Sequence, residues 1–147
     1  MGDKIDKSEQ DWRADLTPEQ YHVCREKGTE RAFTGAYWNT KAHGLYHCAG
    51  CGEPLFGSQE KYDSGSGWPS FWQPLVEHVV ETETDRSLGM ERIEVHCRRC
   101  GSHLGHLFPD GPMPTGKRYC INSLSLQFQS RDRSDTGPDD SGRPSSD

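Results

Sequence analysis

Four of the six cysteines in this sequence have the spacing of metal ligands, because they form two Cys-x-x-Cys pairs: Cys48 with Cys51, and Cys97 with Cys100. A glycine follows each pair and lets backbone amides turn toward the thiolates, as a zinc knuckle requires. Four thiolates are soft anionic ligands that favour a closed tetrahedral zinc site. A thioredoxin-like redox pair would need a β-α-β setting, which neither pair has, whereas an iron centre on the same thiolates is an open alternative. We therefore predict one structural zinc ion.

Redox chemistry is expected of the remaining cysteines, and one of them ends a run of reactive side chains: His103, His106, Asp110, Arg118, Cys120 and Asn122. If this last stretch is extended, Arg118, Cys120 and Asn122 share one face, and Arg118 would lower the pKa of the Cys120 thiol. The histidines could move or hold protons, and Asp110 could orient an imidazole. Taken singly, Cys120 is better explained as a small buried residue, and His103 or His106 as a core histidine or an extra metal ligand. Together, beside a metal site, they favour a catalytic pocket.

Local patterns predict the elements that would hold these residues. Residues 17–20 form a capping box with proline in the first turn, so we expect a helix that runs to about Glu26. Cys24 would then lie on the last turn of this helix. Residues 65–72 form a glycine-rich loop that leads into aromatic side chains. Strands are predicted at residues 45–47, 76–84, 90–96 and 124–128.

Composition bounds the domain organisation. An apolar content of 31%, with 16 glycines and 9 prolines, favours short strands and turns around a small core that a metal ion would reinforce. The charged residues 1–15 are expected to be flexible, and residues 16–130 to form a single domain. Residues 131–147 lack aliphatic and aromatic side chains, so we expect a disordered tail.

Charge and hydropathy limit the partners and the location. The net charge of −6 argues against a nucleic-acid partner, because phosphate backbones select clustered lysine and arginine. The sequence contains no apolar run of membrane-spanning length and no signal-peptide pattern at its N-terminus. Reduced, metal-binding cysteines fit a reducing compartment. We expect a cytoplasmic monomer without a membrane or nucleic-acid partner.

Four segments, taken in order, resemble the type B peptide-methionine (R)-S-oxide reductases: HCAGCGEPLF (47–56), YDSGSGWPSFW (62–72), CRRCGSHLGHLF (97–108) and RYCINS (118–123). The similarity runs from about Leu16 to Phe128. The resemblance implies a mainly β fold of two small antiparallel sheets, with short peripheral helices and a structural four-cysteine zinc site. It also implies reduction of the R epimer of methionine sulfoxide, with peptide- or protein-bound substrate preferred.

The resemblance assigns roles to individual residues. Cys120 matches the nucleophile that attacks the sulfoxide sulfur, and His103 and His106 match the residues that bind the sulfoxide oxygen. Supporting polar groups are implied at Asp110, Arg118 and Asn122. Trp68 and Phe71 match an aromatic wall around the substrate methyl group, although Trp68 by itself is more often a core residue.

The reaction would leave Cys120 as a sulfenic acid, which a second thiol converts to a disulfide that thioredoxin or a similar dithiol reduces. Many members of the family carry this second cysteine in the glycine-rich loop, where this chain has Ser66. We therefore hypothesise that Cys24 is the resolving cysteine. The alternative for Cys24 is that it is a buried core residue and that an external thiol attacks the sulfenic acid. The alternative for the whole chain is a non-catalytic zinc-ribbon-like module that binds peptides through an aromatic pocket.

Overall fold

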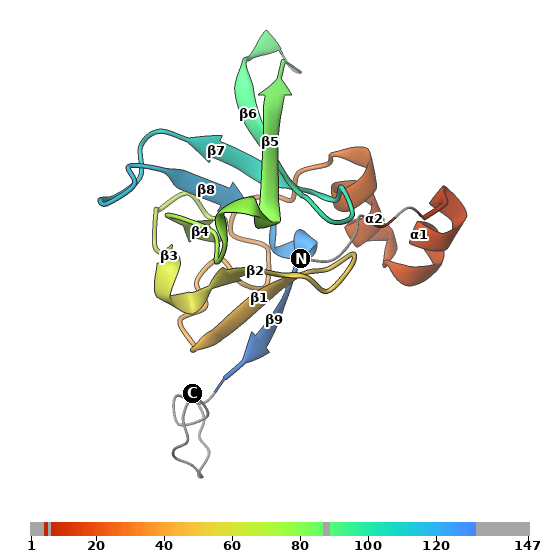
Figure 1. Cartoon of the computed structure of the whole chain (residues 1–147), viewed down its shortest axis with the longest axis horizontal. Coiled ribbons are helices and arrows are strands. Elements are labelled where there is room, and N and C mark those ends of the chain that lie inside the picture. Colours follow the sequence, from red (N-terminus) through yellow and green to blue (C-terminus); the bar gives the residue numbers. More distant parts are fainter. Residues whose placement is uncertain (1–4, 6, 87–88, 132–147) are drawn as a thin grey trace.

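Nine strands form two antiparallel sheets in the computed structural model, which describes residue 5, residues 7–86 and residues 89–131 (Figure 1). The smaller sheet has the order β2-β1-β9, formed by β1 (Gly44–Cys48), β2 (Pro54–Gly57) and β9 (Leu126–Ser130). The larger sheet has the order β3-β4-β8-β7-β6-β5, formed by β3 (Lys61–Tyr62), β4 (Ser70–Phe71), β5 (Val80–Asp85), β6 (Arg92–Cys97), β7 (His103–Phe108) and β8 (Arg118–Ile121). The predicted fold class is confirmed. Beyond Arg131, the predicted tail lies outside the described residues.

Two short helices, α1 (Glu9–Asp15) and α2 (Pro18–Glu26), pack beside the sheets (Figure 1). The predicted capping box of α2 is present: Gln20 N–H donates to Thr17 Oγ1 at 3.1 Å, and Thr17 N–H donates to Gln20 Oε1 at 3.0 Å. None of the helices among the described residues has the length and apolar character needed to span a bilayer.

Helix α1 falls within the segment that the sequence predicts to be flexible, so residues 9–15 differ from that expectation. Trp12 anchors the helix, because its indole is only 2% exposed. The Arg25 guanidinium lies 4.5 Å from the Trp12 ring, and Lys7 stacks on the same ring at 4.4 Å. One buried aromatic residue thus attaches this otherwise charged segment to α2.

Strand boundaries differ from the predicted ones where tight turns replace extended backbone. Residues 77–79 form a 3-10 turn, closed by a hydrogen bond from Val79 N–H to the Val76 carbonyl, so β5 begins only at Val80. Residues 123–125 form a similar turn before β9. The strand predicted at residues 90–96 appears as β6, shifted toward Cys97.

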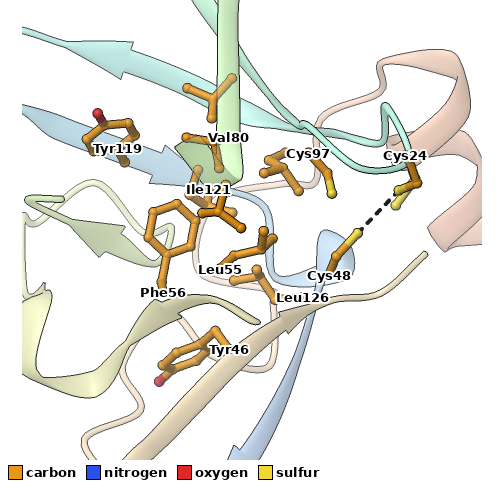
Figure 2. Close-up of a cluster of buried hydrophobic side chains, with 14 of the residues drawn as sticks. Cys24, Tyr46, Cys48, Leu55, Phe56, Val80, Cys97, Tyr119, Ile121 and Leu126 are labelled. Carbon is orange, nitrogen blue, oxygen red and sulfur yellow. Dashed lines mark hydrogen bonds between the residues drawn. The ribbon is translucent and has the colours of Figure 1, made fainter. Parts of the chain in front are cut away.

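Aromatic side chains fill most of the core. Phe56 of the smaller sheet stacks on Phe71 of the larger one, with ring centroids 4.4 Å apart, and Tyr46 meets the same Phe71 ring edge-on at 5.2 Å. Figure 2 shows Tyr46, Phe56 and Tyr119 at one end of this cluster and Cys24, Cys48 and Cys97 at the other. The core therefore joins the two sheets and ends at the cysteines.

A candidate thiol active site and a four-cysteine metal site

Strand register places the candidate nucleophile in a row of polar residues across the larger sheet. Cys120 of β8 lies opposite Ser70 of β4 on one side and His106 of β7 on the other, and His106 in turn lies opposite Glu94 of β6. Directly opposed residues in antiparallel strands point to the same face of a sheet. These four side chains therefore share one face, away from the aromatic core.

A bulge explains how both histidines reach that face although they are three positions apart. In a regular strand, positions three apart point to opposite faces. Between β6 and β7 the register shifts: Val95 lies opposite Gly105, but His96 lies opposite His103, which leaves Leu104 as an extra residue. Leu104 is fully buried in the core, and His103 joins His106 with ring centroids 5.4 Å apart.

A cavity of about 80 Å³ opens on this face. It is lined by Thr29, Trp68, Arg92, Gly105, His106, Phe108, Cys120 and Asn122. Four of the predicted site residues thus line one cavity, whereas Thr29, Arg92, Gly105 and Phe108 were not singled out from the sequence. The cavity combines a thiol, an imidazole and two aromatic rings, and its small volume admits only a small group.

The thiol of Cys120 is under opposing electrostatic influences. Burial raises the pKa of this thiol, and the Ser66 hydroxyl and the Arg118 guanidinium both oppose that rise. The sequence predicts that Arg118 lowers the pKa. Arg118 does act in that direction, but desolvation is the larger effect, so the resting group is more weakly acidic than a free thiol.

Asp110 pairs with Arg118 rather than with an imidazole, which corrects one of its two expected roles. Arg118 donates from Nε to Asp110 Oδ1 at 2.8 Å and from its terminal nitrogen to Oδ2 at 3.2 Å. The guanidinium also lies 4.2 Å from the Phe108 ring. This pairing lowers the pKa of the Asp110 carboxyl. Asp110 therefore fixes the cation near Cys120.

Other carboxylates hold the two histidines. His103 Nδ1 lies 2.8 Å from Glu94 Oε2, and both side chains are only 2% exposed. His106 Nε2 lies 2.8 Å from Asp85 Oδ2, and Arg92 reaches the same oxygen at 3.6 Å. Burial lowers the pKa of His106, and Asp85 opposes this shift. A carboxylate bond at one ring nitrogen fixes each imidazole. His106 lines the cavity, whereas His103 lies behind it and is not among the lining residues.

The aromatic side chains differ in part from the prediction. Trp68 lines the cavity, and its indole Nε1–H donates to the Glu30 carbonyl at 3.0 Å. Phe71, expected beside it, is fully buried in the core instead. Successive residues of β4 face opposite sides, so Ser70 takes the cavity side and Phe71 the core side. Phe108 supplies the second ring at the cavity.

Asn122 lines the cavity, but backbone groups use both ends of its amide. Its Nδ2 donates to the Leu104 carbonyl at 3.0 Å, and its Oδ1 accepts from Glu30 N–H at 3.0 Å. Because Glu30 also holds Trp68, Asn122 connects the bulge beside His103 to the segment that positions the indole. The geometry gives Asn122 a positioning role.

The four paired cysteines converge as the sequence predicts. Their sulfur atoms all lie within 4.8 Å of one another, with Cys48 to Cys100 at 3.6 Å and Cys51 to Cys97 at 3.7 Å. Sulfur atoms at the corners of a tetrahedron around zinc would be roughly 3.8 Å apart, given Zn–S bonds of about 2.3 Å. The donor set and its spacing therefore fit one tetrahedral metal ion.

Cys24 lies beside these cysteines rather than beside Cys120. Its side chain is 2% exposed, and burial raises the pKa of its thiol to about 11. The groups acting most strongly on that pKa include Ser125, Ser102 and Cys100, none of which is among those acting most strongly on Cys120. In Figure 2, Cys24 and Tyr119, the neighbour of Cys120, lie at opposite ends of the core cluster.

Comparison with known proteins agrees with this geometry. A family model described as the SelR domain matches residues 16–130. The chain is also similar to three proteins named peptide methionine sulfoxide reductase MsrB. They come from Leptospira interrogans (58% identical, covering 88% of this chain and 98% of that protein), Thiobacillus denitrificans (60%, covering 86% and 96%) and Pseudomonas aeruginosa (60%, covering 88% and 98%). The family model matches most of this chain, and each of these relatives aligns over most of its own length. This chain therefore belongs to the SelR-domain family of type B methionine sulfoxide reductases.

Proposed function

We propose that this protein reduces the R epimer of methionine sulfoxide, preferably in peptides or proteins, with Cys120 as the nucleophile. Membership of the family supports an oxidoreductase that acts on methionine sulfoxide. The observation that carries the assignment is that Cys120, His106 and Trp68 line one small cavity. A peptide-binding module would need the aromatic wall of such a cavity but not a thiol facing an imidazole.

The cavity suggests how the substrate binds. The S-methyl group packs against Trp68 and Phe108, which exclude water, and the sulfoxide sulfur faces Cys120. The sulfoxide oxygen lies toward His106, which is opposite Cys120 in register and whose other ring nitrogen bonds Asp85. His103 is held by Glu94 and lies next to His106, where it provides a second imidazole that can hold or transfer a proton. A chiral sulfur placed between these walls presents its oxygen to His106 in only one epimer.

The chemistry reduces the sulfoxide and oxidises Cys120. The Cys120 thiolate attacks the sulfoxide sulfur, an S–S bond forms, and the oxygen is protonated and leaves as water. Water then attacks the Cys120 sulfur and breaks the S–S bond, so that methionine leaves and Cys120 becomes a sulfenic acid. A second thiol then displaces water from the sulfenic acid and forms a disulfide. Thioredoxin or a similar dithiol reduces this disulfide and restores the thiol.

An external thiol, rather than Cys24, is the resolving group that we propose. Cys24 is buried at the far end of the core from Tyr119, the neighbour of Cys120, so it would have to move to reach a sulfenic acid at Cys120. We expect Cys24→Ala to keep wild-type turnover with thioredoxin, with dithiothreitol-supported turnover as the control. If the variant lost only its thioredoxin-supported activity, Cys24 would be the resolving cysteine and α2 would have to move during turnover.

The four clustered cysteines would hold a structural zinc ion. Such an ion would supply no step of the reaction, since all four ligand positions are filled by protein sulfur atoms and the cavity is lined by other residues. A zinc thiolate site and a thioredoxin-type reductant both suit a reducing compartment, so we propose that the protein works in the cytoplasm. We also propose that it works as a monomer.

Turnover of separate R- and S-methionine sulfoxide peptides with dithiothreitol tests the function. The wild-type protein should consume only the R epimer, and Cys120→Ser should consume neither, because a serine hydroxyl is a far weaker nucleophile toward sulfur. Cys24→Ser is the matched control for loss of a cysteine. If folded, zinc-loaded wild-type protein reduced neither epimer, the cavity would instead belong to a peptide-binding module.

A further inference from the structure

A chain of three serine hydroxyls ends at the Cys120 sulfur. Ser66 Oγ lies 3.8 Å from Cys120 Sγ and 2.8 Å from Ser64 Oγ, and Ser64 Oγ lies 2.7 Å from Ser70 Oγ. Ser70 donates onward to the Trp68 carbonyl at 3.1 Å. When Ser70 donates to this carbonyl, it accepts a hydrogen bond from Ser64, and Ser64 accepts one from Ser66, because each hydroxyl has a single proton.

The chain has two arrangements that differ in the direction of all three hydroxyls. When Cys120 is a thiol, its S–H points to Ser66 Oγ, and Ser66 donates to Ser64. When Cys120 is a thiolate, Ser66 donates to the sulfur, Ser64 donates to Ser66, and Ser70 donates to Ser64 instead of to the Trp68 carbonyl. The hydroxyls therefore follow the charge of Cys120 without leaving a buried donor unpaired.

The loop that carries Ser66 is held by its backbone conformation and by contacts of Gly67 with residues 32 and 33. Gly65 and Gly67, with φ of 78° and 89°, adopt a left-handed backbone that orients Ser66 between them. The Gly67 carbonyl accepts from Phe33 N–H at 2.8 Å, and a Cβ on Gly67 would come within 2.8 Å of Phe33 and Ala32. The hydroxyl of Ser66 is therefore presented to Cys120 by a fixed loop.

We propose that Ser66 is a catalytic residue: its hydroxyl donates a hydrogen bond to the Cys120 thiolate before the reaction and to the sulfenic oxygen after it. Donation to an anionic sulfur offsets part of the desolvation that burial imposes on this thiol. Donation to the sulfenic oxygen holds the product until an external thiol arrives, since serine itself cannot form a disulfide. Only this second role rests on the proposed reductase function.

Alkylation of Cys120 by iodoacetamide as a function of pH tests the first role, with the modified peptide quantified by mass spectrometry. Ser66→Ala should alkylate about three- to tenfold more slowly near pH 7, because the lost hydrogen bond lowers the thiolate population while the higher nucleophilicity of the remaining thiolate offsets part of this loss. Its rate should reach at least the wild-type plateau at high pH, where every thiol is ionised and the thiolate of higher pKa is the better nucleophile. A lower plateau would indicate a change in access to the thiol and would overturn the proposal, as would an unchanged profile.

Matched variants separate the hydroxyl from the shape of the side chain. Ser66→Thr keeps the hydroxyl and should retain the wild-type midpoint of the alkylation profile. Ser66→Val has nearly the same shape as Ser66→Thr but no hydroxyl, so it should behave like Ser66→Ala. The comparison of threonine with valine therefore tests the proposal even if Ser66→Ala does not fold. Ser64→Ala removes the neighbouring acceptor that favours the thiol state, and it should alkylate no more slowly than wild type. Slowing by Ser64→Ala equal to that by Ser66→Ala would overturn the proposal.

Sulfenic acid trapping with dimedone, after one equivalent of R-methionine sulfoxide peptide, tests the second role. Ser66→Ala should lose its trappable sulfenic acid faster than wild type. A shifted alkylation profile without sulfoxide reduction by either protein would keep the thiolate contact and reject the reductase function. If both proteins reduced the sulfoxide, with identical alkylation profiles and identical sulfenic acid lifetimes, the reductase function would stand and the role of Ser66 would be rejected.

Discussion

Replacing Cys48 with serine is expected to abolish the cooperative thermal transition of the protein. Cys48 ends β1 of the smaller sheet and Cys97 ends β6 of the larger one, so a metal held by both pairs would cross-link the two sheets. Zinc binding to such sites contributes about 10–16 kcal/mol in small peptides, whereas domains have a net stability of only about 5–15 kcal/mol. Loss of one ligand therefore removes a large part of the net stability. Circular dichroism melts and zinc content measure the result.

The control for this prediction is the other buried cysteine. Cys24→Ser places the same substitution at an equally buried position outside the metal-ligand set, so it should bind one zinc ion and melt cooperatively at a somewhat lower temperature. Chelation of the wild-type protein should reproduce the Cys48→Ser melt. A metal-free Cys48→Ser protein with the full wild-type transition would show that the cysteine cluster is not what joins the sheets.

Features that depend on short sequence spacing were predicted well. The capping box of α2 and the convergence of the two Cys-x-x-Cys pairs both appear in the structure, because each depends on residues only a few positions apart or on ligands of one chemical type. Helix α1 was not predicted. Its sequence is charged, and its stability depends on burying Trp12 under Arg25, which is distant in sequence.

The carboxylates that hold the histidines show why the rest of the site could not be predicted. Asp85 and Glu94 reach His106 and His103 only through the pairing of β5, β6 and β7, and the bulge at Leu104 decides which histidine faces them. Sequence proximity favoured Asp110 instead, which pairs with Arg118. In β6, Glu94 alternates with the apolar Ile93 and Val95, so the sequence pattern places it on the polar face, and only the structure shows that it is buried. A carboxylate buried in this way needs a partner, which here is the imidazole of His103.

Replacing Ser66 with cysteine is expected to give the protein its own resolving thiol. The Ser66 hydroxyl already points at Cys120 from 3.8 Å, so a thiol at this position needs only a small movement of the glycine-flanked loop to form a disulfide. An intramolecular thiol acts at an effective concentration of millimolar or more. With thioredoxin at micromolar concentration, steady-state turnover should therefore rise on the order of tenfold or more where resolution limits the rate.

The same substitution should slow the first half of the reaction, because it removes the hydroxyl that we assign to stabilising the Cys120 thiolate. Single-turnover reduction of the R-sulfoxide peptide should be slower in Ser66→Cys than in wild type, while its thioredoxin-supported turnover is faster. Non-reducing peptide mapping after one turnover should recover residue 66 linked to Cys120. Ser64→Cys, one hydroxyl further from the sulfur, is the positional control and should form no such link. If Ser66→Cys formed no disulfide, the loop would not present residue 66 to oxidised Cys120 during turnover, and the role assigned to Ser66 at the sulfenic acid would fail.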